Sequence, residues 1–181
     1  MPVYSLGPLK PKIGKDVFIA PGAQVIGDVE IGEGSSIWFN CVLRGDGNAI
    51  RIGRRCNIQD CTLIHITSMT HPTVIEDDVL VGHMAIVHGC LIRRGGFVGL
   101  GATVMDGCEI ETDGMLAAGA LLTPGKVIKS RQLWAGHPAK YVRDLTEDEL
   151  AYNKAGVDSY ALLAQEFRKN LRCIEPLDGT D

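Results

Sequence analysis

A six-residue spacing of apolar side chains constrains the fold of this chain more than any other feature of its sequence. Branched or large apolar residues keep this spacing along most of the chain when three shifts of register are allowed. Two shifts fall at RGDGNAIR and TSMTHP, and the third is a five-residue step before Ile92. The twenty positions are Ile13, Ile19, Val25, Ile31, Ile37, Leu43, Ile52, Ile58, Ile64, Ile75, Val81, Val87, Ile92, Val98, Val104, Ile110, Leu116, Leu122, Ile128 and Trp134. A period of six is too short for a helical repeat, so it predicts short strands stacked as a parallel β-helix.

The six cysteines fit this repeat better than they fit a metal or disulfide framework. There is no CxxC pair, and Cys41, Cys56 and Cys108 occupy the fifth position of the repeat. Small residues such as Ala23 and Ala85 fill that position in other repeats. We therefore expect these thiols to be reduced and to pack as small buried apolar groups.

Length and charge indicate one domain and exclude several classes of partner. We expect 181 residues to form a single domain with an N-terminal segment at 1–12, a β-helix at 13–134, and a connecting segment, C-terminal helix and tail at 135–181. The net charge is −4 without a strong basic cluster, which argues against nucleic acid and anionic membranes as partners. No apolar run approaches the roughly 18 residues of a membrane span or forms a secretion signal, so we predict a cytoplasmic protein.

The repeat resembles that of the hexapeptide-repeat family. This resemblance implies a left-handed parallel β-helix of triangular section, with three hexapeptides in each coil, and a homotrimer. Counting three repeats per coil places Arg44, His65 and His88 as an outward ladder on consecutive coils of one face, about 4.8 Å apart. Two imidazoles at this spacing can share one Zn²⁺.

His83 belongs to a different face of the predicted prism. It follows Val81 by two positions, so its side chain points toward another edge and does not easily reach a metal held by His65 and His88 of the same chain. In a trimer, one edge of a subunit meets a different edge of its neighbour. The sequence therefore predicts a site between subunits, with His65 and His88 from one chain and His83 from the next.

Several motifs together resemble a narrower family, the γ-class carbonic anhydrases. They are RGD at 44–46, NIQD at 57–60, His65, GHMAIVHG at 82–89 and LLTPGKVI at 121–128. The resemblance implies the metal ligands His65, His83 and His88, an interface ion pair between Arg44 and Asp46, Gln59 beside metal-bound solvent, Asp60 as a supporting residue, and Tyr160 approaching the site from the C-terminal helix.

The same resemblance implies reversible hydration of CO₂ to bicarbonate, a lyase reaction, by a metal-bound hydroxide. Three imidazoles leave a catalytic Zn²⁺ one open position for water, and Fe²⁺ or Co²⁺ also suit this ligand set. The prototype of the class carries glutamates as proton shuttles, but here Gly47 follows Asp46 and the loop TSMTHPT has no carboxylate. We therefore expect turnover that is slow, buffer-dependent or absent. His71 in that loop is interpreted as a surface or loop residue, with the proton shuttle as its alternative role.

Two other functions stay open on the same scaffold. One is an acyltransferase or thioesterase that acts on a CoA thioester, which would need one catalytic histidine and an acyl-donor groove. The other is a non-catalytic homologue that has kept the metal ligands. The metal content of the protein distinguishes the acyltransferase or thioesterase from the anhydrase. Turnover distinguishes the non-catalytic homologue from the anhydrase.

The C-terminal part of the chain carries a helix signal. Thr146 and Glu149 form a capping box, and an apolar stripe follows at Leu150, Val157, Tyr160, Ala164, Phe167 and Leu171. We expect this helix to pack along the β-helix or a neighbouring subunit. The segment WAGHPAKYVRDL before it is predicted to be a connector, and the tail at 173–181 is predicted to be frayed.

Overall fold

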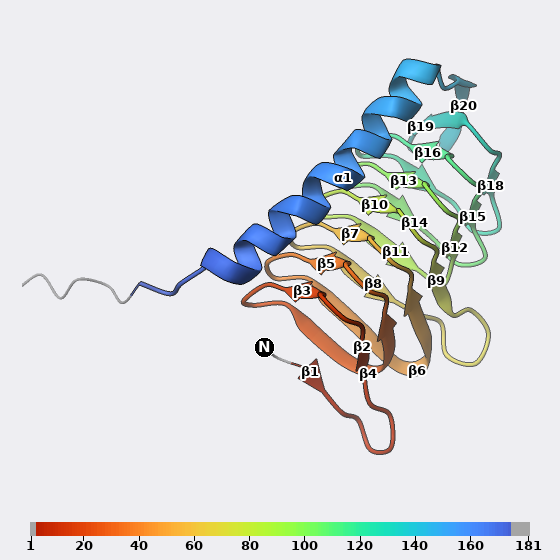
Figure 1. Ribbon diagram of the computed structural model, residues 1–181. Helices are drawn as coiled ribbons and strands as arrows, with labels where there is room; N and C mark the ends of the chain where they lie inside the picture. Colours follow the sequence, from red (N-terminus) through yellow and green to blue (C-terminus); the bar gives the residue numbers. More distant parts are fainter. Residues whose placement is uncertain (1–2, 175–181) are drawn as a thin grey trace, which may run out of the picture.

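The computed structural model describes residues 3–174 as a stack of parallel β-coils with one long helix along its side (Figure 1). One sheet has eight strands: β3 (Phe18–Ile19), β5 (Ser36–Ile37), β7 (Asn57–Ile58), β10 (Leu80–Val81), β13 (Phe97–Val98), β16 (Met115–Leu116), β19 (Gln132–Gly136) and β20 (Ala139–Asp144). The predicted parallel β-helix of hexapeptide repeats with a C-terminal helix is confirmed.

A second sheet of twelve strands forms the other two faces of the stack. Its strands are β1 (Val3–Tyr4), β2 (Lys12–Ile13), β4 (Gln24–Ile31), β6 (Val42–Ile52), β8 (Leu63–His65), β9 (Thr73–Ile75), β11 (Ile86–His88), β12 (Leu91–Ile92), β14 (Thr103–Val104), β15 (Glu109–Ile110), β17 (Leu121–Leu122) and β18 (Val127–Ile128). The two faces form one sheet because the long strands β4 and β6 pair with strands of both faces.

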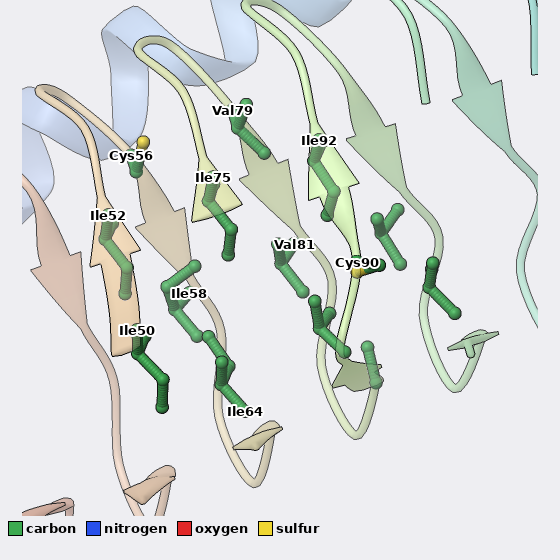
Figure 2. Close-up of a cluster of buried hydrophobic side chains, with 14 of the residues drawn as sticks. Ile50, Ile52, Cys56, Ile58, Ile64, Ile75, Val79, Val81, Cys90 and Ile92 are labelled. Carbon is green, nitrogen blue, oxygen red and sulfur yellow. The ribbon is translucent and has the colours of Figure 1, made fainter. Parts of the chain in front are cut away.

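The core is the column of apolar side chains that the six-residue period predicts. Each inward residue stacks on its counterpart one coil away, as Ile58 does between Ile37 and Val81. Figure 2 shows isoleucines and valines of successive coils pointing into the same space. Eighteen of the twenty predicted positions are buried; Ile13, in the first coil, is exposed, and Trp134, in the last, is partly buried. The ends differ because a neighbouring coil covers them on only one side.

The predicted packing of the cysteines is confirmed at the repeat positions, whereas Cys61 and Cys173 are exposed. Cys41, Cys56 and Cys108 are buried, and burial raises the pKa of Cys41 and of Cys56 to about 12. Such thiols stay protonated at neutral pH, so they serve as packing groups rather than nucleophiles.

The connector that the sequence predicts at WAGHPAKYVRDL is instead a β-hairpin, and this part of the prediction was wrong. β19 and β20 pair antiparallel, with Gly136 opposite Ala139 across a tight turn at His137 and Pro138. β20 thereby pairs with the outer side of β19, whose backbone groups would otherwise lack partners, and becomes the last strand of the eight-stranded sheet.

Helix α1 (Glu147–Asn170) packs along the eight-stranded sheet of its own chain, as one of the two predicted arrangements has it. Val157 and Ala164 are buried, while Tyr160 and Phe167 contact an aromatic cluster that contains Phe18 and Trp38. Leu171, which we placed on the apolar stripe, lies just after the helix and is exposed.

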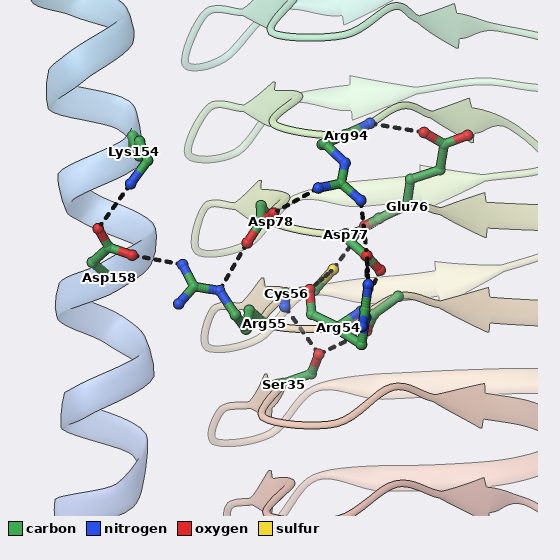
Figure 3. Close-up of polar contacts among 11 residues, drawn as sticks. Ser35, Arg54, Arg55, Cys56, Glu76, Asp77, Asp78, Arg94, Lys154 and Asp158 are labelled. Atoms are coloured by element: carbon green, nitrogen blue, oxygen red, sulfur yellow. Dashed lines mark hydrogen bonds and ion pairs between the residues drawn. The ribbon is translucent and has the colours of Figure 1, made fainter.

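A ladder of charged residues ties the helix to the corners of the coils (Figure 3). Arg55 donates to Asp78 of the next coil at 2.8 Å and to Asp158 of the helix at 2.6 Å. Asp77 accepts hydrogen bonds from the side chains of Arg54 and Arg94. Because these groups are solvent-accessible, the apolar contacts contribute more to helix docking than the ion pairs do.

Residues 175–181 of the tail that we predicted to be frayed lie outside the described residues. Among residues 3–174, no helix combines the length and the apolarity needed to cross a bilayer.

The capping box predicts a pH-dependent contribution to stability. Thr146 and Glu149 bond reciprocally, and the hydrogen bond from Arg143 together with that from the Thr146 backbone lowers the pKa of Glu149 from 4.5 to about 2. A carboxylate with a depressed pKa stabilises the fold above its unfolded pKa, and this contribution is lost as the pH falls through its folded pKa. Glu149→Gln is therefore expected to lower the thermal midpoint at pH 7 and to have little effect at pH 2.

The matched control for this prediction is Glu166→Gln, which makes the same change at an exposed position of the same helix. We expect no effect from this variant at pH 7. A Glu149→Gln deficit of equal size at pH 7 and pH 2 would show that the carboxylate charge does not stabilise the cap.

Candidate metal centre

The two histidines of the outward ladder lie side by side on adjacent coils. β8 and β11 pair in parallel with His65 opposite His88, since each histidine directly follows an inward residue, Ile64 or Val87. The ring centroids are 5.2 Å apart, and His65 Nδ1 lies 3.1 Å from His88 Nε2. The structure thus places these two imidazoles as the coil count predicts.

A carboxylate contacts the outer nitrogen of each ring. Asp46 Oδ1 lies 2.9 Å from His65 Nε2, and Asp106 Oδ1 lies 2.6 Å from His88 Nδ1. The hydrogen bond with His65 is the largest cause of the lowered pKa of Asp46. Burial opposes the shift at Asp106, but hydrogen bonds from His88 and Thr67 outweigh it and lower the pKa of that carboxyl. Both groups are therefore acceptors at neutral pH.

Counting protons shows that this row of groups has room for a cation. The contacts Asp46–His65, His65–His88 and His88–Asp106 each need one proton, but two neutral imidazoles carry only two. When the outer nitrogens donate to the carboxylates, the lone pairs of His65 Nδ1 and His88 Nε2 face each other. A proton or a metal ion between them relieves this repulsion.

The spacing and chemistry of these donors fit a first-row divalent metal. Two nitrogens bound at 2.0–2.1 Å to one tetrahedral Zn²⁺ are about 3.3 Å apart, close to the 3.1 Å between the facing nitrogens. A carboxylate on the far nitrogen of a ligating histidine is the usual support in zinc sites, because it fixes the tautomer and the ring orientation. The residues present therefore suit such an ion.

His83 lies on the eight-stranded face, just after β10, and is not part of this pair. Its Nδ1 contacts Asp60 Oδ2 at 2.8 Å, and its backbone N–H donates to Gln59 Oε1 at 3.2 Å. Gln59 is buried, so its amide holds the His83 backbone from inside the turn. Within residues 3–174, no three His, Cys, Asp or Glu side chains gather closely enough to hold a metal ion. The chain contributes the two parts of the predicted ligand set at separate places.

The remaining predicted residues lie around these two groups. Arg44 pairs with Asp46 within the chain, so Asp46 links the guanidinium to His65. Tyr160 of helix α1 packs on Trp38; burial raises the pKa of Tyr160, and the charge of Asp60 raises it further. His71 lies on the loop after β8, with Nδ1 3.1 Å from Thr70 Oγ1.

Sequence reasoning missed Asp106. Val104 pairs with Val87 of the adjacent coil, so Met105 is opposite His88. Asp106 is the residue after Met105. A carboxylate one coil away from a histidine on the same face is the signal that could have found it. Asp106, however, lies in the turn between β14 and β15. Strand alternation does not set the direction of a side chain in a turn, so the sequence does not show that Asp106 points toward His88.

Comparisons with known proteins place the chain in a family. A family model described as bacterial transferase hexapeptide (six repeats) matches residues 10–45. The chain is 48% identical over 170 residues to a protein of Arabidopsis thaliana named gamma carbonic anhydrase 2, mitochondrial; the match covers 91% of this chain and 60% of that protein. The chain thus spans less than two thirds of the length of this relative.

Two other relatives match along most of their own length. A Geobacillus kaustophilus protein named carbonic anhydrase is 43% identical over 148 residues, covering 82% of this chain and 81% of that protein. The crystal structure of a hexapeptide transferase family protein from Anaplasma phagocytophilum superposes with a TM-score of 0.88 at 42% identity, covering 92% of this chain and 98% of that one. The paired histidines, the stacked coils and these matches together show that the chain belongs to the γ-class carbonic anhydrase family of hexapeptide-repeat proteins.

Proposed function

We propose that this protein hydrates CO₂ reversibly to bicarbonate in the cytoplasm, as a homotrimer with one Zn²⁺ site at each subunit interface. The observation that carries the proposal is the pair of facing nitrogens of His65 and His88, each ring backed by a carboxylate. Relatives named carbonic anhydrase at 43–48% identity support the reaction. The cytoplasmic location rests on the sequence, and the Arabidopsis relative is named mitochondrial.

The arrangement of the three histidines supports an interfacial site. His65 and His88 project from one face, and His83, supported by Asp60 and Gln59, projects from another. In a closed ring of three copies, each interface joins two different surfaces of the subunit. His83 of a neighbouring subunit would then complete the ligand set.

Exposed apolar side chains accompany both groups of ligands, which supports their burial in an interface. Leu63 and Ile86, on the strands of His65 and His88, are 39% and 42% exposed. Met84, next to His83, is 70% exposed, and Leu100, on the following coil, is 53% exposed. Apolar groups clustered beside a polar site are typical of surfaces that bind another protein.

The residues of the chain would prepare the site as follows. Asp46 binds one nitrogen of His65 and Asp106 binds one nitrogen of His88, so the remaining nitrogens of the two rings point toward each other. Asp60 contacts Nδ1 of His83 and leaves Nε2 of that ring free. Zn²⁺ held by these three imidazoles would supply a bound water molecule whose pKa is about 7. Arg44 neutralises Asp46 and keeps it in place. Gln59 beside the reacting solvent, Tyr160 approaching the site and His71 as proton carrier stay predictions.

The test is stopped-flow CO₂ hydration by protein of measured metal content over a range of buffer concentrations. We expect turnover that increases with buffer, because the loop TSMTHPT offers no carboxylate to accept the proton. His88→Ala is expected to abolish turnover, since it removes one of the facing nitrogens. Samples loaded with Zn²⁺, Co²⁺ or, without oxygen, Fe²⁺ compare the metals that three imidazoles accept.

A fully metallated protein without turnover would overturn the anhydrase proposal. Hydrolysis or transfer of an acyl group from a CoA thioester by the same sample would then favour the thioester reading. Metal binding without either activity would favour a non-catalytic homologue. The pair of histidines supports the anhydrase over the transferase, which needs one catalytic histidine.

A further inference from the structure

The loop that interrupts the repeat at 67–72 lies against the outward histidines. Thr67 and His71 pair across its base, with Thr67 N–H donating to His71 O at 3.0 Å and His71 N–H donating to Thr67 O at 3.1 Å. This closes the loop directly after β8, which carries His65, and leaves the Thr67 side chain facing Asp106.

The hydroxyl of Thr67 fixes the carboxylate of Asp106. Thr67 Oγ1 donates to Asp106 Oδ2 at 2.8 Å, while Oδ1 of the same carboxylate contacts His88 Nδ1 at 2.6 Å. The carboxylate therefore cannot rotate away from His88 without losing the bond to the loop. Gly89 leaves space for this arrangement, because a Cβ at that position would lie 2.3 Å from Asp106 Oδ1.

A second threonine at the far end of the loop fixes the spacing of the two coils. The buried hydroxyl of Thr73 donates to His65 O and accepts a hydrogen bond from Gly89 N–H at 2.9 Å. It thus links the backbone of one histidine to the residue after the other. The two threonines flanking the insertion hold the backbone spacing and the ring orientation of the pair.

We propose that Asp106, held by Thr67, is a positioning residue that keeps His88 Nε2 directed at the metal. This inference rests on the proposed function, because it assumes that His65 and His88 bind a metal. An acceptor on Nδ1 keeps the proton there and leaves the Nε2 lone pair free. The insertion that breaks the hexapeptide register is then the element that preorganises the metal pair.

The test measures Zn²⁺ affinity by competition with a chromophoric chelator, using the full-length protein. Asp106→Asn is expected to weaken binding about 10- to 100-fold, the usual effect of losing such a support. Asp106→Ala is expected to weaken it more, since no acceptor stays on His88 Nδ1. Thr67→Val, which removes only the hydroxyl donor, should give a smaller loss, and Thr67→Ser should restore the affinity of the original protein.

Asp113→Asn is the matched control, because this carboxylate lies in a turn beside helix α1 and makes no side-chain hydrogen bond among the described residues. Thermal unfolding of each variant separates lost affinity from lost folding, and the absorption of Co²⁺-loaded samples reports the ligand geometry. Unchanged affinity in Asp106→Asn, with binding lost in His88→Ala, would overturn the positioning role alone. An original protein that binds no Zn²⁺ would overturn this role together with the proposed metal site.

Discussion

Mixed trimers of His65→Ala and His83→Ala subunits are expected to hydrate CO₂, although neither variant does so alone. The proposed interfacial site needs His65 and His88 from one subunit and His83 from its neighbour. Each interface that combines an intact pair from a His83→Ala subunit with His83 from a His65→Ala subunit is complete. With equal amounts and random exchange, about one quarter of the interfaces meet this condition, because each of two independent choices has a chance of one half.

The geometry of the pair provides a strict control for this experiment. His65 and His88 lie on paired strands of the same chain with facing nitrogens, so both must come from one subunit. A mixture of His65→Ala with His88→Ala is therefore expected to recover no activity. Subunit exchange is verified by mass spectrometry of differently labelled chains. Absence of recovery in the first mixture despite complete exchange would contradict the interfacial site.

Ile110→Ala is expected to lower the free energy of unfolding of the subunit by about 2–5 kcal/mol, the usual cost of truncating a fully buried isoleucine. Ile110 is buried in the core between Ile92 and Ile128 of the adjacent coils. The cavity cannot collapse easily, because backbone hydrogen bonds on both sides fix the distance between coils. Ile110→Val should cost only about 0.5–1.5 kcal/mol.

The same chemical change at an exposed site isolates the effect of burial. Ile174 is 84% exposed after helix α1, so Ile174→Ala is expected to change the unfolding free energy very little. The free energies are measured by urea unfolding at a fixed protein concentration, because assembly would add a concentration-dependent term. Equal losses at positions 110 and 174 would show that the inward column does not stabilise the coils.

Local periodicity made most of the fold predictable from the sequence. A side chain on a short strand points inward or outward by alternation, so a fixed period of six assigns eighteen buried residues correctly. The capping box at Thr146 and Glu149 is equally local, and the structure confirms it. The hairpin at β19 and β20 was not found, because its turn at His137 and Pro138 lacks the Asn-Gly or Asp-Gly pair that is the strongest sequence signal of a tight hairpin.

The candidate site likewise has a part that could be predicted from the sequence and a part that could not. The six-residue period, read with the three repeats per coil that the family resemblance implies, placed His65 and His88 as neighbours on one face and His83 on another, and the structure agrees. Only the tertiary structure decided how the rings are held. Asp106 reaches His88 from a corner of the next coil, and Thr67 reaches Asp106 from a loop 39 residues earlier in the chain. Corners and loops follow no fixed period, so the directions of these side chains depend on packing between coils.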